Sequence, residues 1–278
     1  MRNAAILIPV HNRRATTLAC LRRLQENGDI ERFDVIIIDD GSTDGTREAV
    51  QDAFPTISIL SGNGDLWWTG AIALGMSHAF ERGADLVFWL NDDCLPRAGA
   101  LESVARFIAT ERESIVAPVC IDPTTNTRIA SGFKGRTDLP APARGEIVMA
   151  HGLSGYCLAV PRSVWERIGT PDADRFPHYY GDTSYTVQAH AAGFPIVILG
   201  DAEVELADFQ GRIRSPGQYR NPARSWTKEY TRTFLNKKSP FRLATQWHML
   251  RLKYGVALGS MLAVQRFAAW SLRFAFGK

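Results

Sequence analysis

The segment "DLVFWLNDDC", Asp85 to Cys94, joins a continuous apolar run to a polar end. The run Leu86–Leu90 contains no polar residue, which is typical of a strand covered on both faces of a parallel sheet. Two adjacent acids, Asp92 and Asp93, follow the run. Two like charges at the end of a buried strand are unfavourable unless a positive group lies beside them. The segment therefore predicts a core strand whose end needs a cation.

Apolar runs of the same kind occur earlier in the chain and alternate with helical segments. We predict strands at "AAILIPV" (residues 4–10), "FDVIIID" (33–39) and the shorter "TISIL" (56–60). Residues 15–25 and 71–82 are predicted to be helices, and each is followed by a glycine that can end a helix. The repeated strand–helix units predict an open, doubly wound α/β sheet with right-handed crossovers.

Polar residues follow three of the predicted strands. The turn Pro9–Asn12 follows the first strand, Asp39 and Asp40 end the second, and Asp92 and Asp93 follow the fourth. In an open α/β sheet, ligands bind beyond the carboxyl ends of the strands. We therefore expect these three groups to converge on one site.

The chain after the fourth predicted strand is less regular. Residues 120–152 show no clear period. "GYCLAVPRSVWERIG" (155–169) predicts a strand that turns into a short helix at Pro161. "GDTSYTVQAHAAGFPIVIL" (181–199) predicts a helix that ends at Gly193, with a strand after it.

Composition places the chain among ordinary globular proteins. Its 278 residues are 45% hydrophobic and 22% charged, enough to bury a sizeable core. No stretch reaches the ~18 apolar residues of a membrane span, and the first apolar run is too short for a signal peptide. The cysteines are scattered without a C-x-x-C pair, which argues against a disulfide framework or zinc knuckle and favours a cytoplasmic location. The four are Cys20, Cys94, Cys120 and Cys157.

The motif "IIIDDGSTDGT" (Ile36–Thr46) leads a strand into two acids and a turn. In one interpretation, its polar residues only cap the next helix. An EF-hand loop starting at Asp40 fails because position twelve is Gln51 rather than a bidentate Glu. A phosphatase-type D-x-D-G-T nucleophile also fails, because the two acids are adjacent. A carboxylate that accepts a hydrogen bond from a nucleobase or a ribose is the functional interpretation.

The motif "GNGDLWWTGAIALG" (Gly62–Gly75) combines four glycines with two adjacent tryptophans. The glycines allow close backbone approach, and Trp67 and Trp68 offer large flat surfaces. The spacing does not fit a phosphate-binding P-loop. Tryptophans that only fill the core remain the alternative.

The pair in "NDDC" is suited to a hard divalent cation. Mg²⁺ or Mn²⁺ needs few protein ligands where substrate phosphates and waters complete the octahedron. The alternative is that Asp93 caps a helix formed by the following "PRAGALESV", which leaves Asp92 unexplained.

The motif "FPHYYGDTSY" (Phe176–Tyr185) places Asp182 between aromatic residues at a predicted helix start. Asp182 could cap that helix. It could also act as a general base beside His178 and the tyrosines.

In this order and on this sheet, the motifs resemble glycosyltransferase family 2, enzymes of the GT-A fold, over residues 3–205. "ILIPVHN" and "VIIIDDGSTDGT" resemble its opening strand and nucleotide-binding strand, "NDD" its metal motif, and "YYGDTSY" its base motif. "GNGDLWWTGA" with "LNDD" looks most like rhamnosyltransferases and other makers of bacterial surface polysaccharide, lipopolysaccharide among them. One departure is Gly181, where many members have Glu, and another is Ser184, where an acid is often found.

The resemblance implies a role for each site residue. Asp182 would be the catalytic base, and Asp93, helped by Asp92, would hold Mg²⁺ or Mn²⁺. The implied nucleotide-binding residues are Pro9, Val10, Asn12, Asp39, Asp40, Gly70 and Asp92. The implied acceptor-side residues, on weaker grounds, are Trp67, Trp68, Gly155, His178 and Tyr180.

The implied reaction is an inverting transfer of a sugar, with rhamnose as one candidate, from a UDP or dTDP donor. The acceptor would be a hydroxyl of a glycan or a lipid-linked molecule. A protein that binds sugar nucleotides without catalysis is the alternative. A sugar nucleotidyltransferase would need a glycine-rich basic loop after the first strand, and "PVHNRRATT" has no glycine.

The last part of the chain differs in charge from the rest. Residues 211–278 contain fourteen Lys and Arg and one acid, a net charge of +13, whereas residues 1–210 carry eighteen and twenty-eight, a net charge of −10. We therefore expect a GT-A domain at 1–210, with a nucleotide half at 1–120 and an acceptor half at 121–210. A basic helical extension is expected at 211–278.

Residues 240–278 predict a basic amphipathic helix. If this segment is one helix, Arg251, Arg266 and Arg273 lie within a sector of about 60°. Such a helix suits an anionic membrane surface, which would place the protein on the inner face of the cytoplasmic membrane. Packing on its own domain or in a homo-oligomer is the alternative. No nucleic-acid-binding motif accompanies the charge, so we expect no nucleic-acid partner.

Overall fold

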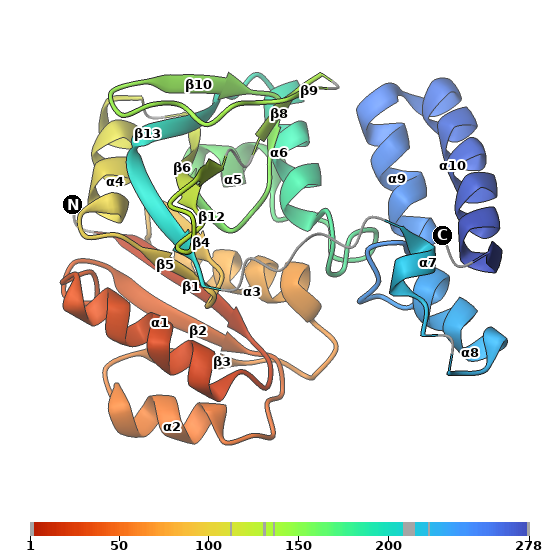
Figure 1. Cartoon of the computed structure of the whole chain (residues 1–278). Coiled ribbons are helices and arrows are strands. Elements are labelled where there is room, and N and C mark those ends of the chain that lie inside the picture. The colour runs from red at the N-terminus through yellow and green to blue at the C-terminus, as the bar shows by residue number, and fades with distance from the viewer. Residues whose placement is uncertain are drawn as a thin grey trace.

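The computed structural model describes residues 3–111, 113–129, 132–135, 137–207, 215–221 and 223–276. A central sheet is flanked by helices, and a group of C-terminal helices lies beside it (Figure 1). The predicted α/β class, with a mostly parallel central sheet and a helical C-terminal extension, is confirmed.

Strand β4 (Leu86–Leu90), predicted from the opening segment, lies in the middle of the main sheet. It pairs in parallel with β1 (Ala4–Val10) and antiparallel with β12 (Cys157–Pro161). The strand order is β10-β13-β6-β12-β4-β1-β2-β3. The other members are β2 (Asp34–Asp39), β3 (Ser58–Ser61), β6 (Ile115–Ile121), β10 (Ile147–Ala150) and β13 (Ile196–Leu206), with β5 (Cys94–Pro96) on β13 and β7 (Arg128–Ile129) on β6.

The strands are continuously apolar because both faces of the sheet are covered. In β4, Phe88 and Leu90 belong to the core on one face, and Val87 and Trp89 to the core on the other. Every residue of this strand is buried. The first face carries α1 (Arg14–Glu26), α2 (Thr46–Ala53) and α4 (Ala100–Thr110), and the second carries α3 (Trp67–Glu81), α5 (Arg162–Ile168) and α6 (Gly181–Ala191).

The region without a clear sequence period contains short strands. Strands β11 (Gly152–Leu153), β8 (Gly132–Lys134) and β9 (Thr137–Asp138) form a separate three-stranded sheet. Strands of two or three residues are too short to produce a detectable alternation.

The four cysteines, scattered in sequence, all belong to the core on the α1 face. Each is free and buried. Burial raises the pKa of every one of these thiols, that of Cys120 to about 12. They are therefore thiols of the apolar core, since a reactive cysteine needs a lowered pKa and access to solvent.

The C-terminal extension is a cluster of short helices followed by a helical hairpin. Its boundary at residues 210 and 211 lies outside the described residues. Phe234, Phe241 and Phe274 form a small core of its own. Its elements are α7 (Pro216–Tyr219), α8 (Trp226–Tyr230), the π-helix η1 (Thr231–Leu235), α9 (Leu243–Tyr254) and α10 (Val256–Phe276).

Residues 240–278 do not form the single helix considered from the sequence. The helix is interrupted at Gly255, where φ is +78°, and α9 and α10 lie side by side (Figure 1). A Cβ at Gly259 would lie 2.5 Å from the Leu250 carbonyl oxygen, so glycine allows the two helices to approach closely. Arg251 therefore lies on a different helix from Arg266 and Arg273. Among the described residues, no helix has the length and apolarity needed to cross a bilayer.

Candidate functional site

A cavity of about 330 Å³ lies at the carboxyl ends of β1, β2 and β4, where α3 begins. The three groups of polar residues that follow these strands all contribute to its wall, which confirms the predicted convergence. The lining residues are Pro9, Val10, His11, Arg13, Asp40, Gly64, Trp67, Trp68, Ala71, Asn91, Asp92, Asp93, His178 and Lys238.

The positive group beside Asp92 and Asp93 is the guanidinium of Arg13. Its Nε lies 2.8 Å from Asp92 Oδ1 and its Nη2 lies 2.9 Å from Asp93 Oδ2. Thr17 Oγ1 donates a further hydrogen bond to Asp92. The Asp92 side chain is 4% exposed and that of Asp93 35%. The two acids therefore differ. Asp92 is buried in the cavity wall and held by hydrogen bonds, whereas Asp93 is partly exposed to the cavity.

Burial raises the pKa of the Asp92 carboxyl, and the Arg13 guanidinium partly offsets this effect. The alternative in which Asp93 caps the following helix is wrong. The segment after Asp93 forms β5, and α4 begins only at Ala100, after Gly99. The carboxylate pair is thus free of any helix-capping role.

Asp40 caps α3 from a distant part of the chain. Its Oδ2 accepts the Trp67 N–H at 2.9 Å and its Oδ1 accepts the Gly64 N–H at 2.8 Å. This explains why α3 begins one turn earlier than the predicted Ala71, since a helix start is stabilised by an acceptor for its free N–H groups. Asp39 has a local role, because its Oδ1 accepts the Ser42 N–H at 2.9 Å.

Asn12 connects the two loops on this edge of the sheet. It adopts a left-handed conformation with φ of +53°. Its backbone N–H donates to Ser42 Oγ, and its Oδ1 accepts the Thr43 N–H at 2.7 Å. The neighbouring His11 Nδ1 lies 2.6 Å from the Asp40 carbonyl oxygen. Asn12 therefore holds the loops after β1 and β2 together.

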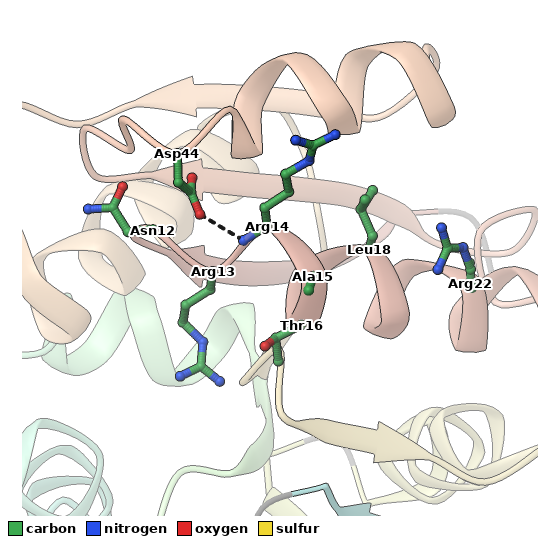
Figure 2. A pocket seen from close by; sticks show the side chains of 8 residues that line it. All are labelled: Asn12, Arg13, Arg14, Ala15, Thr16, Leu18, Arg22 and Asp44. Atoms are coloured by element: carbon green, nitrogen blue, oxygen red, sulfur yellow. Dashed lines mark hydrogen bonds between the residues drawn. The ribbon is translucent and has the colours of Figure 1, made fainter.

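A second, more open groove of about 620 Å³ lies on the other side of the β1–α1 loop. Figure 2 shows that the side chains of Arg13 and Arg14 point in opposite directions from this loop. The backbone N–H of Arg14 donates to Asp44 Oδ2 at 3.1 Å. Only Arg13 contacts the carboxylate pair, so the two consecutive arginines form a natural matched pair for mutation. The groove is lined by Asn12, Arg13, Arg14, Ala15, Thr16, Leu18, Arg22 and Asp44.

Asp182 lies in the first turn of α6. Its Oδ2 accepts the Gly155 N–H, and its Oδ1 accepts the Thr183 N–H at 2.6 Å. Within the described part of the chain, no cation pairs with this half-buried carboxylate. Burial raises the pKa of Asp182, and the backbone N–H of Gly155 offsets part of that effect.

Gly155 allows this carboxylate to approach the strand region. A Cβ on Gly155 would lie 2.6 Å from Asp182 Cβ and 3.2 Å from Trp68 Cη2. At its other end the Trp68 indole donates from Nε1 to Asn91 Oδ1 at 2.7 Å. The Trp68 ring thus extends from the cavity wall to Asp182, which is not itself among the lining residues.

At the position of Gly181, many members of the family that the sequence resembles have Glu. Packing explains why this position has no side chain here. A Cβ here would lie 2.1 Å from Thr69 Oγ1. The preceding Tyr180 takes a left-handed conformation with φ of +67°. Its hydroxyl accepts a hydrogen bond from Gln246 Nε2 of α9 at 3.1 Å. The segment that carries Asp182 is therefore attached to the C-terminal extension.

The imidazole of His178 lines the cavity. Its Nδ1 is buried without a hydrogen-bond partner among the described residues. Burial, with a contribution from Lys238, lowers its pKa to about 4. Its ring lies 6.0 Å from that of Trp67.

Two stretches far apart in sequence provide the cavity with basic side chains that the sequence interpretation did not assign. Arg13 follows the first strand, and Lys238 comes from the extension. The neighbouring Lys237 holds this segment in place, because its Nζ lies 2.7 Å from Asp65 Oδ2. The "HNRR" after the first strand was a usable signal for Arg13, whereas Lys238 was one of many cations in a basic tail. His11 and Asn91 also line the cavity and were not assigned.

Several residues assigned from the sequence lie outside the cavity. Gly70 lies within α3 and is buried, and a Cβ there would lie at an ordinary contact distance of 3.4 Å from Leu66 Cβ. Those that the cavity wall does not include are Asn12, Asp39, Gly70, Gly155, Tyr180 and Asp182.

Residues 5–166 match the sequence model of Glycosyl transferase family 2. The chain belongs to glycosyl transferase family 2. No curated protein sequence gives a match. The matched range includes the whole carboxylate pair, the Arg13 loop and Gly155, and it ends before Asp182.

Solved structures with the same fold are glycosyltransferases. PcManGT, a mannosyltransferase from Pyrobaculum calidifontis in complex with GDP-Man and Mn²⁺, has a TM-score of 0.59 and 16% identity, covering 99% of this chain and 79% of that one. GalNAc-T7 with UDP, GalNAc and Mn²⁺ has a TM-score of 0.61 and 12% identity, covering 95% and 53%. TarS of S. aureus has a TM-score of 0.58 and 15% identity, covering 99% and 43%. The chain thus spans most of the first neighbour but about half or less of the other two.

The family 2 chain offers a donor set that suits a divalent metal bound together with a diphosphate. Among the described residues, no three His, Cys, Asp or Glu side chains are grouped so that they could hold a metal ion. Mg²⁺ and Mn²⁺ at phosphate sites commonly use one or two carboxylates, and the substrate completes the shell. Asp93 is half exposed, and its Oδ1 accepts no hydrogen bond from the described residues. Asp93, with Asp92 beside it, therefore fits such an ion.

Proposed function

We propose that this family 2 protein is a metal-dependent, inverting hexosyltransferase. It takes a sugar, with rhamnose as the first candidate, from a UDP or dTDP donor. The acceptor is a hydroxyl of a glycan or of a lipid-linked molecule in bacterial surface polysaccharide synthesis. The observation that carries this proposal is that Trp68 connects the surroundings of two different carboxylates. Its Nε1 donates to Asn91, which lines the same cationic cavity as Asp93, and a Cβ on Gly155 would lie within 3.2 Å of both Trp68 Cη2 and Asp182 Oδ2, an oxygen without a cation among the described residues.

The donor nucleotide would enter the cavity at the β1 and β2 ends. The Pro9–Val10 backbone would line the base, and Asp40 would accept from its N3–H. Each carboxylate oxygen has two lone pairs, so the two backbone N–H groups that Asp40 already accepts leave room for one more donor. Asp39 would contribute indirectly, because its carboxylate accepts the Ser42 N–H and so fixes the loop after β2.

The diphosphate would lie between Asp93 and the basic side chains of the cavity. Arg13 and Lys238 can donate charge-assisted hydrogen bonds to phosphate oxygens. Asp93 and Asp92 would hold Mg²⁺ or Mn²⁺, which supplies Lewis-acid stabilisation of the departing diphosphate. Two neighbours of the same fold, PcManGT and GalNAc-T7, are described with Mn²⁺ and a nucleotide or nucleotide sugar, which supports this arrangement.

Asp182 would remove the proton from the acceptor hydroxyl. A carboxylate whose pKa is raised is a stronger base, and burial raises the pKa of Asp182. As the proton moves to Asp182, the acceptor oxygen forms a bond to the anomeric carbon. The bond from that carbon to the diphosphate oxygen breaks on the opposite face, so the configuration inverts. Trp67, Trp68, His178 and Tyr180 would form the acceptor side.

A panel of nucleotide sugars tests this proposal. A ligand that binds the folded state raises its apparent stability, so the true donor should raise the melting temperature by several degrees, about 3–6 °C, in the presence of Mn²⁺. The same donor should be hydrolysed slowly without an acceptor, and proton NMR of the first-formed sugar should show the inverted anomer. Stabilisation by a donor that is neither hydrolysed nor transferred would favour the non-catalytic binding protein. A retained anomer would contradict the direct displacement.

The proposed location is the cytoplasmic side, with a peripheral attachment to the inner face of the membrane. Nucleotide donors and free, buried cysteines agree with a reducing compartment. Separation of cell lysates into soluble and membrane fractions, before and after a high-salt wash, tests this location.

A further inference from the structure

Helix α10 has one side that packs against the extension and one side that is exposed. Gly259, Ala263 and Phe274 are buried against the rest of the extension. The guanidinium of Arg220 donates to the Phe274 carbonyl oxygen at 3.1 Å, which attaches the end of α10 to α7. The helix is therefore held firmly on one side, and its orientation fixes what the other side presents.

The outward side of α10 is apolar. At ~100° per residue, five of its six large exposed apolar side chains fall within an arc of about 120°, and they alternate with exposed alanines; the sixth, Val256, begins the helix and lies outside the arc. The only polar residue in that arc is Gln265. The large members are Leu258, Met261, Val264, Leu272 and Phe276, which are 40–73% exposed. We call these five residues the α10 outer face.

Charges of one sign border one side of this face. At the same ~100° per residue, Arg266 and Arg273 lie just beyond one edge of this face. Residues 243–276, which include α9 and α10, contain no Asp or Glu. The one acid of the extension, Glu229, is buried beside Arg232. An apolar face with cations and no exposed acid matches a surface that is both apolar and anionic.

A short chain of hydrogen bonds connects this helix to the acceptor side. Arg266 Nη1 donates to Gln246 Oε1 at 2.8 Å, and Gln246 Nε2 donates to the Tyr180 hydroxyl at 3.1 Å. Tyr180 is two residues from Asp182. These hydrogen bonds therefore connect α10 to the segment that carries Asp182.

We infer that the α10 outer face binds an anionic lipid bilayer, with the helix lying in the plane of the interface. The apolar side chains would enter the acyl boundary, and Arg273 would contact lipid phosphates. A second copy is a poorer partner, because two such faces would bring like charges together. The inference goes beyond the sugar transfer and does not depend on it, since binding is measured without any donor.

Liposome co-sedimentation of the full chain tests this inference. The wild-type protein should bind vesicles with about 30% phosphatidylserine and should bind pure phosphatidylcholine much more weakly. The double variant Met261→Asn/Leu272→Asn should lower the partition coefficient at least about tenfold, because two apolar side chains no longer enter the bilayer. Arg273→Gln should lower it about threefold to tenfold on anionic vesicles only.

A matched control comes from the edge strand β10. Ile147 and Met149 are 52% and 49% exposed, so Ile147→Asn/Met149→Asn removes a similar amount of exposed apolar surface elsewhere. Circular dichroism and the melting temperature of both double variants should match the wild type. Equal sedimentation of the two double variants would overturn the inference. So would a wild-type dimer, measured by light scattering, that the α10 variant dissociates while vesicle binding is absent.

Discussion

The acidic pair that follows β4 and the single carboxylate at the start of α6 have different surroundings. Asp92 and Asp93 share a guanidinium, that of Arg13. Asp182 has only the backbone N–H groups of Gly155 and Thr183. The first site therefore has one cation for its two carboxylates before any ligand arrives, whereas the second has a carboxylate without a cation in the part of the chain that the structure describes.

This difference separates two tasks that carboxylates can perform in one protein. A carboxylate pair that already binds a guanidinium is suited to bind a metal ion together with a diphosphate. The guanidinium can then contact the phosphates in place of the carboxylates. A carboxylate in an apolar setting, without a counter-charge, holds a proton more readily and can accept one during a reaction. The environment, rather than the residue type, assigns the task.

The strongest test of this contrast is Asp182→Asn. The amide cannot accept the acceptor proton, so we expect kcat to fall about 10³-fold or more. The affinity for the nucleotide donor should stay within about twofold, because Asp182 lies outside the cavity. Steady-state kinetics and calorimetry measure the two quantities. Asp174→Asn, a change at an exposed acid eight residues earlier, is the control and should leave both unchanged.

The pH profile provides a second readout of the same contrast. Burial raises the pKa of Asp182 above the ordinary value of 3.8, and as the proposed base it would have to be ionised to act. Activity should therefore fall as the pH drops through that raised pKa, at a higher pH than an ordinary carboxyl would give. The residual activity of Asp182→Asn should lack this acid limb. A limb that persists in the variant would assign it to another group and remove Asp182 as the base.

The parts of the fold that depend on local patterns could be predicted from the sequence. The runs that became β1 and β4 are apolar throughout because both sides of these strands are covered, and this leaves a direct record in the sequence. The start of α3 could not be located, because its capping acceptor, Asp40, is 27 residues before Trp67. Gly255 was visible as a glycine, but its role as the turn between α9 and α10 depends on their packing.

The candidate site shows the same limit. Acids at strand ends could be assigned because topology alone brings such ends together. Their cation could not be assigned, because Arg13 and Lys238 are separated by more than two hundred residues and meet only in the folded chain. The departure at Gly181 was visible, but its cause, the closeness of Thr69, is a matter of tertiary packing.

A smaller but still large effect is expected from Gly155→Ala. A Cβ here would lie 2.6 Å from Asp182 Cβ, so the added methyl must displace the carboxylate from the position that the Gly155 N–H fixes. A shift of about 1 Å in a catalytic group can cost about 10²-fold in rate. We expect that loss in kcat with donor affinity unchanged. Ala143→Gly is a suitable control. The nearby Gly145→Ala is not, because Gly145 has a positive φ that alanine adopts only with strain.

The result of Gly155→Ala also bears on the contrast between the two acidic sites. If the donor affinity fell together with kcat, Gly155 would belong to the donor cavity and the two sites would not be separate. Thermal unfolding of the variant should remain cooperative, which would separate a displaced carboxylate from a disrupted fold.

A moderate effect is expected at the cation that the extension supplies. Lys238→Met should raise the KM for the donor about tenfold, since it removes one charge-assisted hydrogen bond to phosphate. Lys237→Met removes only the surface ion pair with Asp65 and should change KM less than about fivefold. If the two variants raised KM equally, the segment with Lys237 and Lys238 would affect donor binding through its position and not through a contact of Lys238 with phosphate.

The smallest expected effect tests why the acidic pair has a cation of its own. In the protein without nucleotide, the Arg13 guanidinium pairs with Asp92 and Asp93 and would compete with the proposed metal for them. Arg13→Gln should therefore bind Mn²⁺ more tightly than the wild type in the absence of nucleotide, by about threefold to tenfold. Electron paramagnetic resonance of free Mn²⁺ measures this affinity without any turnover. Arg14→Gln is the matched control, because the Arg14 side chain points in the opposite direction from that of Arg13 (Figure 2).

The direction of this change distinguishes the two acidic sites. Added Asp93→Ala should abolish the gained Mn²⁺ affinity, because the half-exposed carboxylate is then absent, whereas Asp182→Asn should leave it intact. An Arg13→Gln protein that binds Mn²⁺ no better than the wild type would show that the guanidinium only fixes the loop after β1. In that case Arg13 would be a structural partner of Asp92, and the metal would not need to displace it when the donor arrives.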